Sequence, residues 1–227
     1  MDRIERGFLE KLQAQHRSGD LDVDAEEVVR YLGGWCSPLY FATRLGWCTT
    51  MRWLLDHGAD PHKRADDWTP LHRAGHYCRN EAAVILLDAG ADVDASRKHG
   101  VRPLHDAIDC RCEGTALGTC KLLLSRGASL DVRTRKGRDA EAWARIINKP
   151  RLAALFAAVR AAGGWKPYVD APRRELLALR RELPSLRERG RATPSDDRLY
   201  ERLFHDVRVP DDVFTHVFSY WRTPRDA

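Results

Sequence analysis

The sequence contains no long apolar run, which excludes a first class of protein. Among its 227 residues, no stretch approaches the roughly 18 consecutive apolar residues that a membrane-spanning helix needs. Residues 1–15 have no apolar core of the kind that a secretion signal contains. Six cysteines at irregular spacing therefore indicate free thiols in a reducing compartment. We expect a cytoplasmic or nuclear protein with no membrane partner.

Motifs of catalysis are missing as well. The sequence has no Gly-rich phosphate loop, no nucleophile elbow and no His-Glu metalloprotease helix. Two carboxylates, Asp106 and Asp109, fall within one expected helix, and the sequence identifies no catalytic partner for them. We therefore predict a non-enzymatic protein with no catalytic residue and no cofactor.

The central cysteines raise the question of a metal site. Cys110, Cys112 and Cys120, with His105 upstream, form the best zinc candidate in the chain. A structural zinc site needs four nitrogen or sulfur ligands, and paired ligands usually lie two to four residues apart. The Cys-x-Cys spacing is tighter than this, and a buried cysteine serves equally well as a small apolar residue. We therefore predict no metal.

The residues that are present indicate a folded protein with a mild positive charge. Hydrophobic residues make up 43% of the chain, and seven Trp, six Phe and six Tyr supply large apolar surfaces for a core. The formal net charge is +5 at pH 7, with a pI near 9.0. Net charge bears on association rather than on fold, so this balance favours an acidic partner.

Three segments of the sequence repeat one pattern. Each segment begins with a Pro-Leu pair and an alanine, at residues 37–42, 69–74 and 102–107. Each segment later reaches a Leu-Leu pair followed by a glycine, at residues 54–60, 86–92 and 123–129. The alanines at positions 42, 74 and 107 are 32 and then 33 residues apart. Self-similarity at such a period is the signature of a repeat solenoid.

The residues of each unit predict a pair of helices. The candidates for the first helical position are Pro38, Pro70 and Pro103. Proline suits this position because its fixed φ fits a helix and its missing N–H would be unpaired there anyway. The candidates for the left-handed residue that ends the second helix are Gly58, Gly90 and Gly127. Because such a pair cannot bury its apolar face alone, neighbouring pairs must stack, and we predict an all-α solenoid.

A fourth unit is weaker, and the third is longer than the others. Residues 139–144 and 150–160 keep the helical spacing of a fourth pair. The interval from Gly90 to Gly127 is 37 residues, so about four extra residues lie inside the third unit. We expect these extra residues in the loop between its two helices, at residues 111–118.

These units resemble ankyrin repeats. Residues 69–74, Thr-Pro-Leu-His-Arg-Ala, match the TPLHxA signature of that family, and the resemblance extends over residues 35–162. It implies an ankyrin-repeat solenoid of about four L-shaped units, whose hairpin fingers and inner helices form a concave binding face. It also implies that His72 and His105 hold their turns by local hydrogen bonds. Tyr40 departs from the signature, which has histidine at that position.

Two further regions flank the repeats. Residues 1–34 are predicted to form a helical N-terminal cap or a degenerate repeat, because apolar residues keep helical spacing at Phe8, Leu9, Leu12, Val28, Val29 and Leu32. Residues 163–227 are predicted to form a small helical C-terminal domain, with leucines at 176, 179, 183 and 186.

The expected binding residues fall into two groups. The first is a basic edge along equivalent positions of successive fingers, made of Lys63, Arg64, Arg97, Lys98, Arg133, Arg135 and Lys136. Stacking would bring their potentials together, although most charge runs are simply solvated. Exposed Trp, Tyr and Arg often anchor interfaces, so the second group lies on and beside the inner helices: Arg44, Trp47, Trp68, His76, Tyr77, Arg79 and Asp109. For Trp68, packing against its own turn is the alternative.

The last segment, residues 209–226, reads VPDDVFTHVFSYWRTPRD. Its proline and carboxylates predict the start of an amphipathic helix. The segment resembles the opening helix of an F-box, the motif through which proteins bring substrates to a cullin-RING ubiquitin ligase. The resemblance implies that a Skp-type adaptor or a cullin contacts Pro210, Val213, Phe214, Val217, Phe218 and Trp221. The alternative is a terminal helix that packs on preceding helices or caps the stack.

Taken together, these patterns predict a monomeric protein–protein interaction module. Its concave face would hold an acidic protein target, and its C-terminal segment would connect that target to a ubiquitin ligase. The alternative is binding of nucleic acid or another anionic surface through the basic edge and residues 166–191, which carry eight Lys or Arg against four acidic residues. Protein binding is favoured, because this basic region has few aromatic residues and the chain has no nucleic-acid motif.

Overall fold

The computed structural model describes residues 2–25 and 36–171. Within these residues, strand-like pairing is confined to two isolated bridges, Ala65–Trp68 and Arg97–Val101. The helices are α1 (Arg3–Ser18), α2 (Pro38–Leu45), α3 (Cys48–Asp56), α4 (Pro70–His76), α5 (Asn80–Asp88), a short 3-10 helix (Lys98–Gly100), α6 (Pro103–Ile108), α7 (Glu113–Ser125), α8 (Ala140–Ile146) and α9 (Pro150–Ala161). The prediction of an all-α repeat fold is confirmed.

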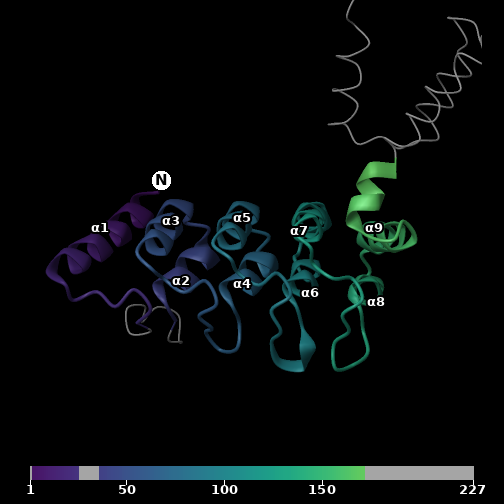
Figure 1. The fold of residues 1–227 in the computed structure, drawn as a ribbon, viewed down its shortest axis with the longest axis horizontal. Helices are drawn as coiled ribbons and strands as arrows, with labels where there is room; N and C mark the ends of the chain where they lie inside the picture. Colours follow the sequence, from purple (N-terminus) through teal and green to yellow (C-terminus); the bar gives the residue numbers. More distant parts are fainter. Residues whose placement is uncertain (1, 26–35, 172–227) are drawn as a thin grey trace, which may run out of the picture. The chain divides into compact units, whose positions relative to one another are not determined.

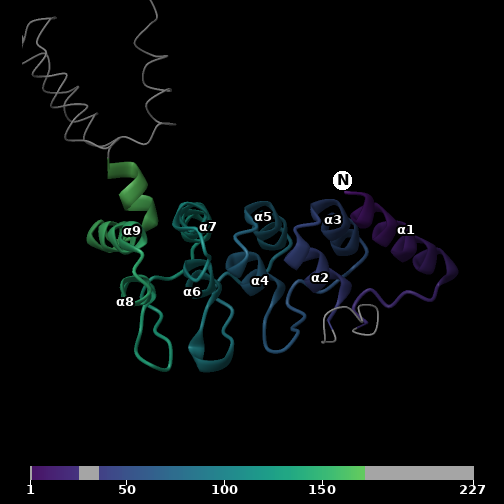
Figure 2. The same cartoon turned by 180° about the vertical axis from the view of Figure 1, so that it is seen from behind.

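The chain divides into two units, Met1–Arg160 and Ala161–Ala227. In the first unit the helices lie in two rows, with α1, α3, α5, α7 and α9 in one row and α2, α4, α6 and α8 in the other (Figure 1). The view from behind shows the same order (Figure 2). Long loops, the fingers, extend away from the second row before α4, α6 and α8. We call α2, α4, α6 and α8 the inner helices, and α3, α5, α7 and α9 the outer helices.

The starts of the inner helices follow from local hydrogen bonds. The prolines at the first positions are Pro38, Pro70 and Pro103. Thr69 caps α4 by accepting the N–H of His72 at 3.3 Å, and Ser37 and Asp139 cap α2 and α8 in the same way. The Nδ1 atom of His72 lies 2.7 Å from the Thr69 hydroxyl, and His105 Nδ1 accepts a backbone N–H at 3.3 Å. The local role expected for these two histidines is confirmed.

The glycines after the outer helices have the conformation that the sequence predicted. Gly58, Gly90 and Gly127 have φ values of 88°, 88° and 93°. This left-handed region disfavours residues with a Cβ atom. The chain can therefore leave each outer helix sharply and enter the next finger.

The extra residues of the third repeat lie in a helix, so their expected placement in a loop at residues 111–118 is wrong. Helix α7 has 13 residues, whereas the equivalent helices α3 and α5 have nine each. The added turn begins at Glu113, where a carboxylate favours the helix macrodipole. Glu113 Oε1 also accepts the backbone N–H groups of Arg151 and Leu152 at 2.8 and 3.2 Å, so the turn caps α9.

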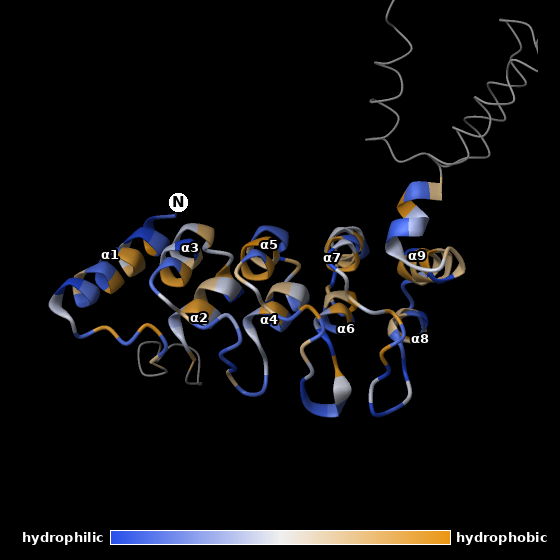
Figure 3. Ribbon diagram, in the orientation of Figure 1, coloured by the Kyte–Doolittle hydropathy of each residue, from blue (hydrophilic) through white to orange (hydrophobic). Residues whose placement is uncertain are grey.

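Apolar side chains fill the space between the two rows. Figure 3 shows apolar residues concentrated on the helices and hydrophilic residues on the fingers. The large side chains that are almost completely buried include Leu39, Leu54, Leu71, Leu86, Leu104, Leu123, Leu152 and Phe156. Small residues allow the inner helices to approach closely: a Cβ atom added at Gly75 would lie 2.8 Å from the Pro103 carbonyl oxygen.

Helix α1 packs against the first repeat. The ring centroid of Phe8 lies 5.7 Å from that of Phe41 and 5.5 Å from that of Trp47. The expected helix around Phe8 is therefore present. The other expected apolar positions of this region, at residues 28–32, lie outside the described residues.

The second unit is described up to residue 171. Residues 165–171 are helical, and the ring centroids of Trp165 and Tyr168 are 5.7 Å apart. The C-terminal leucines and the F-box-like segment at residues 209–226 lie outside the described residues.

Candidate binding surface on the inner helices

Trp68 lies between two arginines. It ends the finger that precedes α4, and its ring centroid is 4.3 Å from Cζ of Arg73 and 4.0 Å from Cζ of Arg97. Guanidinium groups at such distances are attracted by the negative face of the indole ring. The side chain thus packs beside its own turn, which was the alternative to partner contact, and it holds both cations in place.

Arg97 is already paired within the protein. Its Nε and Nη2 atoms donate to the two carboxylate oxygens of Asp106, at 3.0 and 2.6 Å. Asp106 is fully buried; burial raises its pKa to about 6, and the hydrogen bonds from Arg97 oppose that shift. The structure therefore places the guanidinium of Arg97 on Trp68 and Asp106, away from the predicted basic edge.

Arg73 is held equally firmly, but no carboxylate of the described residues pairs with it. Its Nε donates to the hydroxyl of Tyr40, and its Cζ lies 5.3 Å from the Tyr40 ring centroid. Among the described residues, no acidic side chain lies within 4 Å of the guanidinium. Arg73 therefore offers a positioned cation with free N–H donors, suited to a carboxylate from outside the chain.

Aromatic residues extend this surface along α4. His76 lies edge-on to Trp68 and Tyr77, at centroid distances of 5.6 and 5.1 Å, and Arg44 Cζ lies 5.9 Å from the Tyr77 ring. Tyr77 is 37% exposed. Burial and the nearby Arg73 lower the pKa of His76, so its ring is neutral at pH 7. We call Tyr40, Arg44, Trp68, Arg73, His76 and Tyr77 the arginine–aromatic surface.

The remaining predicted residues of the inner helices differ in their surroundings. Arg79 is exposed and crosses Gly46, where an added Cβ would lie 3.1 Å from Arg79 Cδ. Trp47 packs between Phe8 and helix α2, with its ring 5.5 Å from that of Phe41. Asp109 accepts a hydrogen bond from the indole N–H of Trp143 at 2.7 Å.

The fingers of the predicted basic edge are joined to one another. The Arg135 N–H donates to the His99 carbonyl at 2.7 Å, and the Lys98 N–H donates to the carboxylate of Asp67. Arg64 lies 3.4 Å from the same Asp67. Of the residues predicted for this edge, the exposed ones with no ion pair within residues 2–25 and 36–171 are Lys98, Arg133, Arg135 and Lys136. Lys63 is half-buried.

Two residues of this surface, Tyr40 and Arg73, were missed from the sequence. Arg73 occupies the variable position of the TPLHxA segment, and Tyr40 was noted only as a departure from the signature. A usable signal existed, because Tyr40 and Arg73 are 33 residues apart and are therefore close to equivalent positions in neighbouring repeats. Residues one period apart meet when repeats stack.

The zinc candidate is not assembled. In the part of the chain that the structure describes, no three His, Cys, Asp or Glu side chains are grouped to hold a metal ion. Cys120 is buried in α7, and His105 binds its own turn. None of the helices described is long and apolar enough to cross a membrane.

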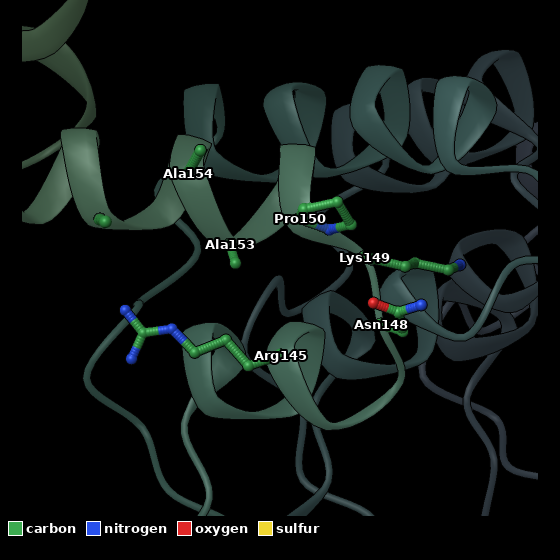
Figure 4. Close-up of a pocket in the computed structure, with 7 residues that line it drawn as sticks. Arg145, Asn148, Lys149, Pro150, Ala153 and Ala154 are labelled. Atoms are coloured by element: carbon green, nitrogen blue, oxygen red, sulfur yellow. The ribbon is translucent and has the colours of Figure 1, made fainter.

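An open hollow of about 390 Å³ lies between α8 and α9 (Figure 4). It is lined by Arg145, Asn148, Lys149, Pro150, Ala153, Ala154 and Ala157. The Nζ atom of Lys149 donates to the carbonyls of Ile108 and Cys110, so this cation is already engaged. The side chains that line the hollow include no carboxylate, hydroxyl or thiol group.

The fold defines a helical-repeat solenoid. Residues 5–97 and 39–134 match the model of the family described as ankyrin repeats (3 copies). The chain belongs to the ankyrin-repeat family. Ankyrin repeats generally mediate protein–protein interaction, and the family is typically non-enzymatic.

Similar proteins align with less than half of this chain. The human neurogenic locus notch homolog protein 4 is 41% identical over 87 residues, which cover 37% of this chain and 4% of that protein. The human BCL-6 corepressor-like protein 1 is 34% identical over 101 residues, or 44% of this chain and 5% of that protein. The Drosophila melanogaster Notch protein is 37% identical over 87 residues, 37% of this chain and 3% of that protein. The chain thus spans a small fraction of each relative's length.

Proposed function

We propose that the chain is a protein-binding module whose arginine–aromatic surface grips an acidic segment of its target. The observation that carries this proposal is the environment of the Arg73 guanidinium. Tyr40 and Trp68 fix this guanidinium, yet no carboxylate of the described residues forms an ion pair with it. A cation fixed in this way loses little side-chain entropy when it meets a partner carboxylate, so binding gains more per hydrogen bond.

Neighbouring residues support the same partner chemistry. Arg44 and Arg79 add two cations with no ion pair within the described residues, and Tyr77, which is 37% exposed, offers an apolar contact beside Arg44. Arg, Tyr and Trp are the residues that most often dominate binding energy at interfaces. We therefore expect a target segment with acidic residues beside an apolar or aromatic one.

The exposed basic residues of the fingers have a different role in this proposal. Lys98, Arg133, Arg135 and Lys136 are solvated, and ion pairs at such positions contribute little to affinity. They speed the encounter with an acidic target instead. A nucleic acid could meet the same charges, and the salt dependence of binding separates the two, since phosphate contacts give a steep linear decrease with salt.

A second candidate function concerns the C-terminal segment. The resemblance of residues 209–226 to an F-box helix favours recruitment of a Skp-type adaptor or a cullin through Pro210, Val213, Phe214, Val217, Phe218 and Trp221. Affinity purification of the full chain beside a version that ends at Gly164 tests it. Tail-dependent recovery of such an adaptor supports the candidate, and equal recovery from both versions removes it.

The main proposal is tested by selecting peptides from a randomised display library on the purified full chain. We expect the selected peptides to be enriched in Asp and Glu. Arg73→Ala should then weaken a selected peptide by about 10-fold or more. The matched control is Arg52→Ala, because Arg52 is an exposed arginine on the outer helix α3 that pairs with Glu81 at 3.5 Å. Equal losses in the two variants, or peptides without acidic enrichment, would overturn the proposal.

A further inference from the structure

Two arginine–tyrosine contacts cross between α2 and α4 in opposite directions. Arg73 of α4 donates to the hydroxyl of Tyr40 on α2, and its Cζ lies 5.3 Å from the centroid of that ring. Arg44 of α2 makes the reverse contact, with its Cζ 5.9 Å from the ring centroid of Tyr77. The two residues of each contact are 33 residues apart in the sequence. Each arginine thus lies against the equivalent position of the neighbouring repeat.

The two contacts lie one helical turn apart. Tyr40 and Arg44 are separated by four residues on α2, and Arg73 and Tyr77 by four residues on α4, where the Tyr77 N–H donates to the Arg73 carbonyl at 3.0 Å. Side chains four residues apart on a helix share one face, about 5–6 Å from each other. Helices α2 and α4 pack side by side (Figure 1). One guanidinium group is therefore held at each of two successive turns.

Arg79 adds a third cation beyond these two turns. It too lies against the position 33 residues away, which is Gly46 at the end of α2. A Cβ atom added at Gly46 would lie 3.1 Å from Cδ and 3.5 Å from Cζ of Arg79, so glycine leaves the room that this side chain uses. We call Arg73, Arg44 and Arg79 the arginine row.

The arginine row is specific to the first two repeats. The third repeat has Asp106 and Cys110 at the positions of Arg73 and Tyr77. Asp106 is buried and accepts hydrogen bonds from Arg97. Within residues 2–25 and 36–171, by contrast, no carboxylate forms an ion pair with the arginine row. The row therefore offers its charges to a partner along the seam between α2 and α4.

We propose that the arginine row binds an acidic α-helix of the target protein, and that carboxylates at positions i and i+4 of that helix pair with Arg73 and Arg44. This inference rests on the proposed function and adds to it the conformation of the target segment and the spacing of its acidic residues.

The spacing of the arginine–tyrosine contacts favours a helix as the occupant. A helix that lies along α2 and α4 rises by the same distance in each turn as they do, about 5.4 Å. Its carboxylates at i and i+4 therefore face guanidinium groups at successive turns. An extended segment advances about 6.6 Å over two residues, so its side chains fall out of step with the inner helices. The tyrosine rings hold both guanidinium groups in place before the target arrives.

A pair of isomeric peptides tests the spacing on the unmodified full chain. Both are Ala/Gln-based peptides of about 18 residues, long enough to be helical, and both carry two glutamates. The glutamates stand at i and i+4 in the first peptide and at i and i+2 in the second, where a helix turns them roughly 200° apart. Titration at low salt, followed by nuclear magnetic resonance, gives the two dissociation constants. We expect the first peptide to bind about fivefold more tightly.

Variants of the chain identify the second contact. Arg44→Gln should remove the preference, so that both peptides bind with equal affinity. The matched control is Arg52→Gln, which changes an exposed arginine of the outer helix α3 and should retain the preference. If circular dichroism shows that Arg44→Gln is unfolded, the comparison of the two peptides on the unmodified chain still decides.

Three results would overturn the inference. They are equal affinity for the two peptides, a preference that Arg44→Gln leaves unchanged, and tighter binding of the second peptide, which would indicate an extended acidic segment. Arg73→Ala separates these failures from a failure of the proposed function. If this variant weakens binding of both peptides equally, the acidic target stands and only the helical spacing is lost. If it changes neither affinity, both are lost.

Discussion

Charged side chains on and beside the inner helices are paired in the third and fourth repeats and less often paired in the first and second. In the third and fourth repeats several polar side chains pair with one another: Arg97 with Asp106, Trp143 with Asp109, and Glu141 with Arg145 and Arg160. In the first and second repeats Arg44, Arg73 and Arg79 have no ion pair with any described residue. Arginine side chains thus stabilise the fold in the third and fourth repeats, whereas in the first and second repeats they have no ion pair with a described residue. The difference locates the proposed binding site beside α2 and α4.

Removing the internal pair should have the largest effect. Asp106→Ala leaves the guanidinium of Arg97, whose side chain is 19% exposed, without its carboxylate. We expect the free energy of unfolding to fall by about 3–5 kcal/mol in urea denaturation. The double variant Arg97→Met with Asp106→Leu should recover most of this loss, because it removes both charges. A loss below about 1 kcal/mol for Asp106→Ala would show that the third repeat does not depend on this pair.

Acid should destabilise the scaffold that both halves share. Burial lowers the pKa of His72 to about 4, from an ordinary value of 6.5. The unfolded chain therefore takes up the proton first, so this contribution to stability is complete above pH 6.5 and is lost as the pH falls toward 4. The loss should amount to about 3 kcal/mol.

The contribution of His72 is measured as a difference between variants. Urea denaturation at pH 7.5 and at pH 4.5 should show a steeper loss for the unmodified chain than for His72→Gln. The exposed His62 provides the control, since His62→Gln should behave like the unmodified chain. Parallel pH profiles for all three proteins would contradict the assignment.

Removing the hydrogen bond that positions Arg73 should weaken peptide binding and leave the free energy of unfolding almost unchanged. Tyr40→Phe removes the hydroxyl that accepts from Arg73 Nε but keeps the ring beside the guanidinium. We expect about a threefold loss of affinity for a selected acidic peptide in calorimetry, because Arg73 becomes less well positioned. Tyr168→Phe, in the second unit, is the matched control. An unchanged affinity in Tyr40→Phe would mean that Arg73 does not need this positioning.

Reversing charges on the fingers should give the smallest effect. Lys98→Glu with Arg135→Glu changes two exposed side chains that have no ion pair within the described residues. The association rate should fall several-fold at low salt, and the dissociation rate should stay the same. Stopped-flow measurements over a salt series provide this separation. A change confined to the dissociation rate would place the fingers inside the interface.

The sequence predicted the parts of the fold that depend on local chemistry. Proline at a first helical position and glycine at a left-handed position act within a few residues, so Pro70 and Gly90 could be assigned from their neighbours alone. The extra residues of the third repeat, predicted in a loop at residues 111–118, form the added turn of α7 instead. The stabilising contact of that turn is Glu113 at the start of α9, 38 residues away in the chain.

The candidate site was only partly predictable, because it too depends on contacts between residues that are distant in the sequence. Exposed side chains such as Tyr77 could be chosen by residue type and position. Nothing in the local sequence showed that Arg97 would bind Asp106, or that Arg73 would lie between Tyr40 and Trp68. Whether an arginine is neutralised depends on which side chains the stacking of repeats brings within a few ångströms. Local patterns therefore identify the cations and leave their pairing to be found in three dimensions.

Nuclear magnetic resonance of the arginine Nε–H groups, followed during titration with a selected acidic peptide, compares the two halves directly. We expect the resonance of Arg73 and the indole signal of Trp68 to shift in proportion to bound peptide. The signals of Arg97 and of the Trp143 indole, which are already bonded to carboxylates, should stay in place. Shifts at Arg97 and Trp143 with an unchanged Arg73 would contradict a binding surface on α2 and α4.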